Sequence, residues 1–199
     1  MPQEVIIDVP VGDMRGIALI GHPPPLLGGN AKHKVPHFLA RALCDDGWLV
    51  ARPNFRSVGR SAGIHDAGIG ETDDVLHLHA SLRAARPDMR IALVGFSFGA
   101  FVLAQAVSRL AASGDPAWRA CLAGMPWGEV EGGRRYDTPS DIPEALVIHG
   151  ERDERVPLAS VMEWARSAQQ TVAVVPDADH FFTSKLPVLR RLVLGWLAG

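Results

Sequence analysis

The chain has 199 residues, of which 47% are hydrophobic and 21% are charged, and its formal net charge is −2. This length predicts one domain, residues 1–199, with a buried core. A nearly neutral surface gives no electrostatic basis for binding nucleic acid or an anionic membrane, and the N-terminus lacks the basic start and apolar core of a signal peptide. We therefore expect a cytoplasmic protein, a monomer or small homo-oligomer, with neither nucleic acid nor membrane as a partner.

Short apolar runs, which predict strands, alternate with stretches of helical periodicity. In chain order the expected strands are residues 5–9, 17–21, 48–51 (closed by Arg52 and Pro53), 91–94, 119–123, 145–149 and 172–175. The expected helices are residues 32–45, 71–85, 100–107, 158–168 and 186–197. Residues 57–70 read as a glycine-rich loop, and residues 128–142 as a polar loop or short excursion. This alternation indicates an α/β fold, a mainly parallel central sheet with helices on both faces.

The most informative segment is Gly95-Phe96-Ser97-Phe98-Gly99, between the strand at 91–94 and the helix at 100–107. A serine between a buried strand and a buried helix must sit in a very sharp turn. Such a turn needs Gly95 and Gly99, because a Cβ at either position would collide with the neighbouring strand or helix. Such a turn presents the hydroxyl and places the Phe98 N–H at a helix N-terminus, where it stabilises a developing oxyanion. We predict that Ser97 is a nucleophile. The alternative is a serine in an ordinary glycine-flanked loop.

A serine nucleophile needs a base, and the base needs an acid that orients it. In a parallel sheet the working groups collect at the carboxyl ends of the strands. The loop after residues 145–149 contains Asp153, and the loop after residues 172–175 contains His180, so both leave the same sheet edge as Ser97. We predict Asp153 as the acid and His180 as the base.

Four segments together resemble the α/β-hydrolase superfamily over almost the whole chain. Residues 95–99 resemble its nucleophile elbow, residues 149–157 its acid loop and residues 179–181 its histidine loop. Residues 54–61 are similar to an Arg-Gly-x-Gly-x-Ser turn of many members, with Ser57 in place of the first glycine. The resemblance is to small, lid-poor bacterial serine hydrolases. These are related in architecture to the dienelactone hydrolases, which carry a cysteine at the elbow where this chain has a serine.

This resemblance implies the α/β-hydrolase fold with a minimal cap or none. Larger members insert a helical lid between the two strands that correspond to residues 119–123 and 145–149, and the interval here is too short for one. We therefore expect an open site with small rims formed by residues 125–127 and 181–182.

The acid and base assignments each have an alternative. Glu151 is the main rival of Asp153 as the acid, and Asp153 is alternatively an N-cap of the helix that follows. His180 is alternatively a solvated loop histidine. We expect His149 to pack at its strand end near the site, with no catalytic role.

An oxyanion hole needs a second backbone N–H, typically from the loop after the strand at residues 17–21. This loop, residues 22–29, departs from the common His-Gly-x pattern of the family, because residues 23–25 are prolines and have no N–H. Leu26 is the first residue able to donate, and we predict it as the second donor. Leu27 and Gly28 remain alternatives.

Metal and cofactor signatures are weak. His33 and His37 lie four residues apart on a predicted helix, but Lys34 stands where a zincin would carry glutamate. No dinucleotide-binding glycine motif follows a strand, so we expect neither a metal nor a cofactor. Cys44 and Cys121 are expected to pack as small hydrophobes rather than form a disulfide.

The turn at residues 54–61 also carries Arg56 and Arg60. Arginines near a predicted site suggest contact with an anionic substrate, but arginines in such a turn more often brace neighbouring loops through backbone hydrogen bonds. We expect the bracing role.

The combined prediction is a serine hydrolase acting on an ester or related acyl bond of a small-molecule or acylated substrate. Ser97 attacks the carbonyl, His180 takes and returns the proton, Asp153 holds the imidazolium, and water completes the reaction. The same triad serves thioesters and peptides, so a thioesterase or peptidase stays open. A non-enzymatic binding module is a further alternative, although such a module has no need to keep all three residues.

Overall fold

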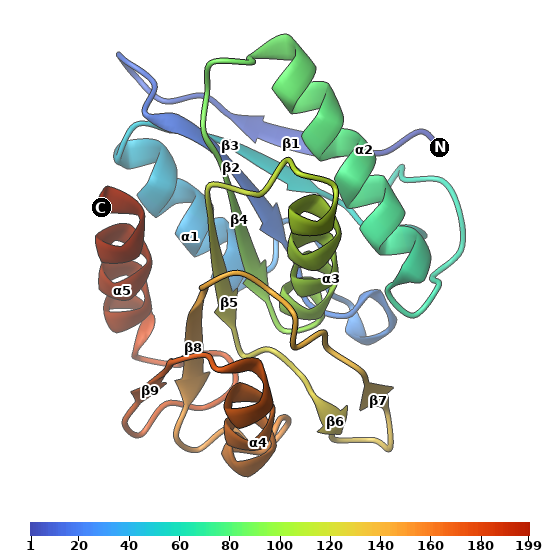
Figure 1. Ribbon diagram of the computed structural model, residues 1–199, viewed down its shortest axis with the longest axis vertical. Coiled ribbons are helices and arrows are strands. Elements are labelled where there is room, and N and C mark those ends of the chain that lie inside the picture. Colours follow the sequence, from blue (N-terminus) through green and yellow to red (C-terminus); the bar gives the residue numbers. More distant parts are fainter.

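The computed structural model describes residues 1–199 and contains a seven-stranded sheet and a separate two-stranded hairpin (Figure 1). The strands are β1 (Val5–Asp8), β2 (Gly16–Gly21), β3 (Trp48–Pro53), β4 (Ile91–Phe96), β5 (Arg119–Ala123), β6 (Gly128–Glu129), β7 (Arg135–Tyr136), β8 (Leu146–Gly150) and β9 (Val172–Val175). The helices are the short 3₁₀ helix η1 (Pro25–Leu27), α1 (Lys34–Asp45), α2 (Ile69–Ala85), α3 (Phe98–Ala112), α4 (Leu158–Ala168) and α5 (Leu186–Ala198). All predicted strands and helices are present.

The large sheet has the strand order β1-β3-β2-β4-β5-β8-β9. Only β1 is antiparallel to its neighbour, and every other pair is parallel. The predicted α/β fold with a mainly parallel sheet is therefore confirmed. Since the parallel strands end at one edge, the loops after β2, β4, β8 and β9 emerge together there.

Helices cover both faces of the sheet, as Figure 1 shows, with α1 and α5 on one face and α2, α3 and α4 on the other. The side chains of each central strand alternate between the two apolar layers. Ile17 and Leu19 of β2 enter the layer beneath α2 and α3, and Ala18 and Ile20 enter the layer beneath α1 and α5. Both faces of the strand are thus buried, which explains its uninterrupted apolar sequence.

Two element boundaries differ from the prediction. β3 continues through Arg52 to Pro53 instead of ending before them, because the edge strand β1 pairs with both residues. α2 begins at Ile69, earlier than predicted, because the buried Glu71 carboxylate caps its N-terminus. That carboxylate accepts the N–H of Gly68 at 2.9 Å and the N–H of Asp66 at 3.0 Å.

The turn at residues 54–61 has the bracing role that was predicted. The Arg56 guanidinium lies 2.6 Å from the Asp74 carboxylate of α2, and the Arg60 Nε donates to the Glu4 carboxylate at 3.2 Å. The partners are carboxylates rather than the backbone groups we expected. Ser57 has a φ of 63°, so it adopts the left-handed conformation that glycine takes most readily at the corresponding family position.

The segment between β5 and β8 contains no helix. Its central part, residues 128–136, folds into the hairpin of β6 and β7, which pairs Glu129 with Arg135. Val130, Tyr136 and Ile142 are buried and anchor the segment to the layer beneath α3. The predicted short excursion is therefore a hairpin, and the predicted absence of a helical cap is confirmed.

Three further points concern the chain as a whole. None of its helices combines the length and apolar character needed to cross a bilayer. Cys121 is buried in β5, Cys44 is half-buried in α1, and both thiols are free. No group of three or more histidine, cysteine or carboxylate side chains is arranged to hold a metal ion.

Candidate active site

Ser97 occupies the turn between β4 and α3, with φ of 56° and ψ of −124°. A positive φ is strained for a residue with a side chain, so the surrounding structure must hold it. The Ser97 N–H donates to the Ala123 carbonyl at 2.9 Å, and the Ser97 carbonyl accepts the Ala100 N–H at 2.8 Å. These bonds tie the turn to β5 on one side and to α3 on the other.

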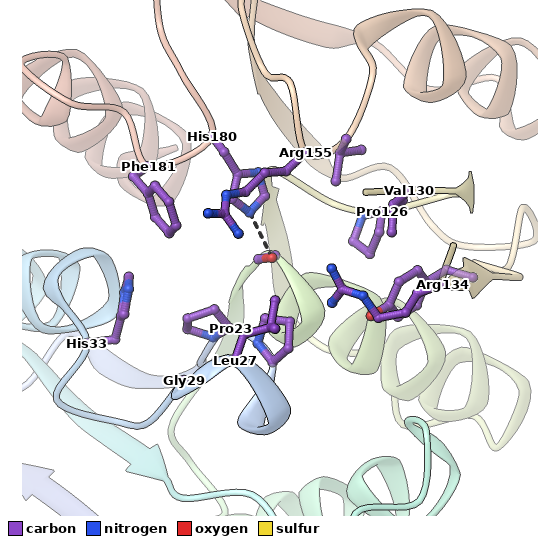
Figure 2. A pocket seen from close by; sticks show the side chains of 14 residues that line it. Pro23, Leu27, Gly29, His33, Pro126, Val130, Arg134, Arg155, His180 and Phe181 are labelled. Carbon is purple, nitrogen blue, oxygen red and sulfur yellow. Dashed lines mark hydrogen bonds between the residues drawn. The ribbon is translucent and has the colours of Figure 1, made fainter. Parts of the chain in front are cut away.

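His180 lies in the loop after β9 and contacts both predicted partners. Its Nε2 lies 2.9 Å from the Ser97 Oγ, and its Nδ1 lies 2.7 Å from the Asp153 Oδ2 (Figure 2, where the dashed line marks the bond to Ser97). A carboxylate accepts hydrogen bonds, so Nδ1 carries the proton and Nε2 is free to accept the serine proton. The structure thus brings Ser97, Asp153 and His180 together, and all three are buried.

Asp153 lies in the loop after β8, and both of its carboxylate oxygens are used. Oδ1 accepts the backbone N–H groups of Arg155 at 3.0 Å and Val156 at 2.8 Å, while Oδ2 faces His180. The carboxylate does not cap α4, whose N-cap residue is Pro157. The rival acid Glu151 is exposed and accepts the Asp177 N–H at 2.8 Å. Of the two carboxylates, only Asp153 is placed to orient the imidazole.

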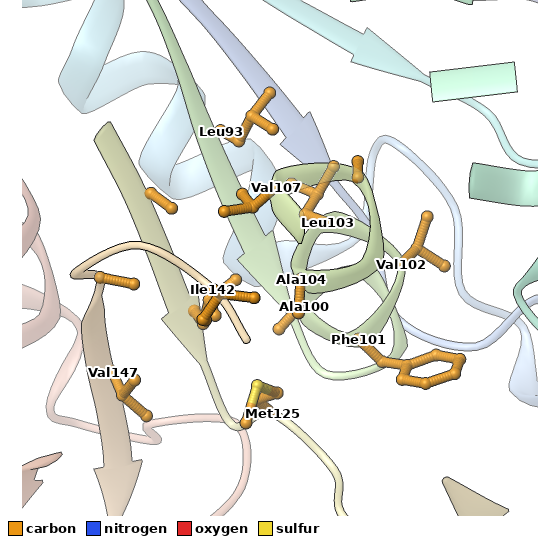
Figure 3. Packing of buried hydrophobic residues seen from close by; sticks show 14 of the residues in the cluster. Leu93, Ala100, Phe101, Val102, Leu103, Ala104, Val107, Met125, Ile142 and Val147 are labelled. Atoms are coloured by element: carbon orange, nitrogen blue, oxygen red, sulfur yellow. The ribbon is translucent and has the colours of Figure 1, made fainter. Parts of the chain in front are cut away.

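Two glycines allow the chain to pass through the turn at Ser97. A Cβ at Gly95 would lie 2.7 Å from the Ala100 nitrogen, and a Cβ at Gly99 would lie 2.7 Å from the His22 nitrogen. Both atoms belong to the backbone and have no room to move aside. Behind the turn, α3 is buried through most of its length against β4 and β5, with Ala100, Leu103 and Val107 toward the sheet (Figure 3). The serine therefore sits on a rigid base.

The first turn of α3 contains Phe98, the predicted oxyanion donor. N–H groups at the start of a helix have no partner inside the helix, and Phe98 is the first helical residue after Ser97. The predicted second donor, Leu26, lies in η1 and its side chain is 68% exposed. Pro23, Pro24, Leu27 and Gly29 line the cavity beside Ser97. The choice of Leu26 stays a prediction.

His22 fastens this proline loop to the loop after β3. The Phe55 N–H donates to the His22 Nε2 at 3.0 Å, so the ring proton resides on Nδ1 and is donated to the Pro23 carbonyl at 2.7 Å. The ring is fully buried, and burial lowers the pKa of His22 to about 4. The attachment of the proline loop therefore depends on a neutral histidine.

His149 is packed at its strand end, as expected. Its Nε2 lies 2.9 Å from the Val156 carbonyl and 3.4 Å from the Asp153 Oδ2, and its ring is fully buried. Burial lowers the pKa of His149, which keeps the ring neutral beside Asp153. His149 thus supports the loop that carries the acid without touching Ser97.

A cavity of about 120 Å³ adjoins Ser97 and His180. Besides those two residues its lining consists of Pro23, Pro24, Leu27, Gly29, His33, Pro126, Val130, Arg134, Tyr136, Arg155, Val156 and Phe181 (Figure 2). Pro126 and Phe181 belong to the predicted rims. The rim prediction was wrong for Met125 and Phe182, because both side chains pack into the apolar layers of the core.

The two histidines considered as metal ligands lie one turn apart at the start of α1 and have different surroundings. His33 lies just before α1 and lines the cavity, where its ring stacks on Phe96 with centroids 6.0 Å apart. Burial lowers the pKa of His33. The His37 Nδ1 lies 3.3 Å from the Arg52 guanidinium, an unfavourable position for binding a cation.

Sequence reasoning missed Arg134, Tyr136, Arg155 and His33 as residues that line the cavity. Arg155 carried a usable signal, because it lies two residues after the predicted acid in a loop already assigned to the site. Arg134 carried none, since nothing in the sequence of residues 128–142 sets the register of the hairpin.

Comparison with known proteins gives a consistent result. No family model matches the chain. A serine hydrolase without a lid from Xanthomonas campestris is 36% identical, with a TM-score of 0.82, and the alignment covers 98% of this chain and 88% of that one. An α/β serine hydrolase homologue from Coxiella burnetii is 31% identical, with a TM-score of 0.84 and coverage of 97% and 90%. An uncharacterized protein of Rickettsia prowazekii is 33% identical over 91% of this chain and 78% of its own length.

Proposed function

The chain belongs to the α/β-hydrolase superfamily, and from this premise we propose that it is a serine hydrolase that cleaves an ester or related acyl bond. The observation that carries the proposal is the continuous relay from Asp153 through His180 to the Ser97 Oγ, with contacts of 2.7 Å and 2.9 Å. The three residues come from three strand ends that meet at one edge of the sheet.

In the proposed mechanism the His180 Nε2 removes the Ser97 hydroxyl proton as Oγ attacks the carbonyl carbon. Asp153 keeps the ring in the correct tautomer and stabilises the imidazolium. The Phe98 N–H, with Leu26 as the predicted second donor, stabilises the oxyanion. His180 then protonates the leaving group, and a water molecule activated by the same ring hydrolyses the acyl-enzyme.

The proposal is tested with a fluorophosphonate probe and a panel of 4-nitrophenyl esters of increasing acyl length. We expect the purified protein to be labelled stoichiometrically and to hydrolyse the short esters. Ser97→Ala removes only the hydroxyl, so it should abolish labelling and lower kcat by a factor on the order of 10⁶. Ser81→Ala is the matched control, because Ser81 is exposed on α2 and bonds only to the His77 carbonyl.

Labelling of Ser97→Ala at the wild-type rate would show that another residue is the nucleophile. Absence of both labelling and hydrolysis in the wild type would favour the non-enzymatic binding module. Thioesters of the same acyl groups, included in the panel, separate an esterase from a thioesterase by their relative kcat/KM.

A further inference from the structure

The charges lining the cavity differ from those of the chain as a whole. The sequence contains 22 acidic and 20 basic residues, yet the 14 residues that line the cavity include two arginines and neither aspartate nor glutamate. Arg134 and Arg155 are therefore the two permanently charged side chains that line this cavity. In Figure 2 the Arg134 guanidinium extends into the cavity from the hairpin, and the Arg155 guanidinium lies beside His180 on the side of Phe181.

The two arginines come from different loops that meet at Glu131. Arg134, in the hairpin, donates from Nη2 to the Glu131 carbonyl at 2.9 Å. Arg155, in the acid loop, places Nη1 3.3 Å from the Glu131 carboxylate, and the Glu131 N–H donates to the Arg155 carbonyl at 3.0 Å. The guanidinium of Arg155 also lies over the Phe181 ring, 4.9 Å from its centroid. Both side chains are thus held in place on the cavity side of Glu131.

The positive charge of this pair is only partly neutralised. The Glu131 carboxylate is 54% exposed and does not line the cavity, so its screening of Arg155 is weak. The cavity lining itself contains two guanidinium groups and no carboxylate. His33 adds no charge at neutral pH, because burial lowers its pKa. Such a lining suits an anionic ligand.

The rest of the lining is largely apolar, and this restricts what else the ligand contains. Pro126 and Val130 flank the hairpin arginine, and Val156 and Phe181 flank the acid-loop arginine. Apolar walls exclude water and strengthen the interaction between a guanidinium and a carboxylate. The cavity volume of about 120 Å³ admits a short chain or a small ring beside the anion.

We propose that the substrate is a small ester that carries a carboxylate, and that Arg134 and Arg155 bind this carboxylate while Ser97 attacks the ester carbonyl. The inference rests on the proposed hydrolase function and adds the substrate class. The arginines act on binding and orientation, so they determine which ester reacts and take no part in proton transfer.

The test compares matched pairs of charged and neutral esters. In the first pair, mono-4-nitrophenyl adipate carries a carboxylate on its acyl chain and 4-nitrophenyl hexanoate is the neutral counterpart. In the second pair, 4-acetoxybenzoate carries the carboxylate on its leaving group and methyl 4-acetoxybenzoate is the neutral counterpart. After subtraction of enzyme-free hydrolysis, we expect kcat/KM to favour the charged member of at least one pair by about tenfold or more at low salt, and the preference to shrink as ionic strength rises. The pair that shows the preference identifies the side on which the carboxylate binds.

The variants Arg134→Gln and Arg155→Gln should each lower the ratio of charged to neutral kcat/KM by about fivefold or more. Arg155→Lys keeps the positive charge but loses the planar guanidinium that can form two parallel hydrogen bonds with a carboxylate. Its ratio of charged to neutral kcat/KM should therefore lie between those of the wild type and Arg155→Gln. The control is Arg135→Gln, an exposed arginine next to Arg134 that does not line the cavity. Its ratio should equal that of the wild type. Because each ratio is measured within one protein sample, partial loss of folded protein cancels.

A wild-type enzyme that hydrolyses the neutral members as well as or better than the charged ones overturns the inference and leaves the proposed function in place. The inference is also overturned, with the proposed function left in place, if Arg134→Gln and Arg155→Gln keep the wild-type preference for the charged ester. If no ester is hydrolysed and no probe binds, the proposed function fails, and the inference fails with it.

Discussion

The turn at residues 95–99 and the hairpin at residues 128–136 line the same cavity, yet they are held in different ways. The turn is fully buried, and its shape depends on backbone atoms in contact with other backbone atoms. The hairpin is mostly exposed, contains three glycines at positive φ, and is anchored by Val130 and Tyr136. The group proposed to react thus stands on a rigid base, while a group proposed to select the substrate stands on a mostly exposed segment anchored by two buried side chains.

After Ser97→Ala, the largest expected loss of activity is at Asp153, the predicted acid, which contacts the rigid turn through His180. Asp153→Asn preserves the shape of the side chain but favours the wrong tautomer of His180, so kcat should fall by a factor on the order of 10⁴. Glu151→Gln should change kcat less than about twofold, because Glu151 bonds only to the Asp177 N–H at 2.8 Å. Kinetics on one short 4-nitrophenyl ester measure both. Equal, small effects would place the acid elsewhere, with Asp177 and Asp179 the next candidates.

A second test compares one glycine from each part. Gly99→Ala forces a Cβ to within 2.7 Å of the His22 nitrogen, so it should lower the free energy of unfolding by on the order of 3 kcal/mol, together with loss of activity. In Gly132→Ala the new Cβ meets only the Arg134 Nε, at an ordinary contact distance of 3.9 Å, so its cost should be about 1 kcal/mol and arise from the φ of 81°. Urea unfolding of both variants checks the difference. Similar losses would mean that the turn is less constrained than its packing indicates.

The proline loop belongs with the rigid part, and pH tests this. His22 has a pKa of about 4 in the folded state against 6.5 when exposed, so below pH 6.5 the unfolded chain binds a proton that the folded chain does not. Stability should therefore fall as the pH falls from 6.5 toward 4, with a His22 contribution on the order of 3 kcal/mol. His22→Gln removes that contribution and should flatten the pH dependence of urea unfolding. If the free energy of unfolding of His22→Gln depends on pH as steeply as that of the wild type, His22 is not the source of the dependence.

The smallest effect is expected at the hairpin. Since no helical cap covers the site, the rate on tributyrin should rise smoothly with concentration through the solubility limit. Limited proteolysis at residues 131–133 should leave activity on a short neutral ester largely intact, because the reacting groups lie outside the hairpin. A jump in rate when micelles or droplets form, or inactivation by the nick, would show that the hairpin gates the site.

The same contrast explains what the sequence predicted. Short-range patterns in the sequence reveal the parallel strands and the loops that follow them, and such loops meet at one edge of the sheet. This is why the sequence could place Ser97, Asp153 and His180 together. The catalytic roles of the three residues stay predictions. Arg134 was missed because its placement depends on the pairing of Glu129 with Arg135, and no local pattern sets that register. Met125 and Phe182 were assigned to rims by proximity, whereas their side chains pack in the core.

The hairpin has a consequence for protein engineering. Its tip, residues 131–133, is exposed, while Glu129 and Arg135 hold the two ends of the tip side by side. Residues inserted between two ends that already lie side by side should lower the stability of the protein only slightly, since each doubling of loop length adds about 0.6 kcal/mol to the entropic cost of closing the loop. New sequence grafted at this point would lie beside the cavity without altering any strand of the large sheet. The tip is therefore a suitable position for building a cover or a second recognition element into this small scaffold.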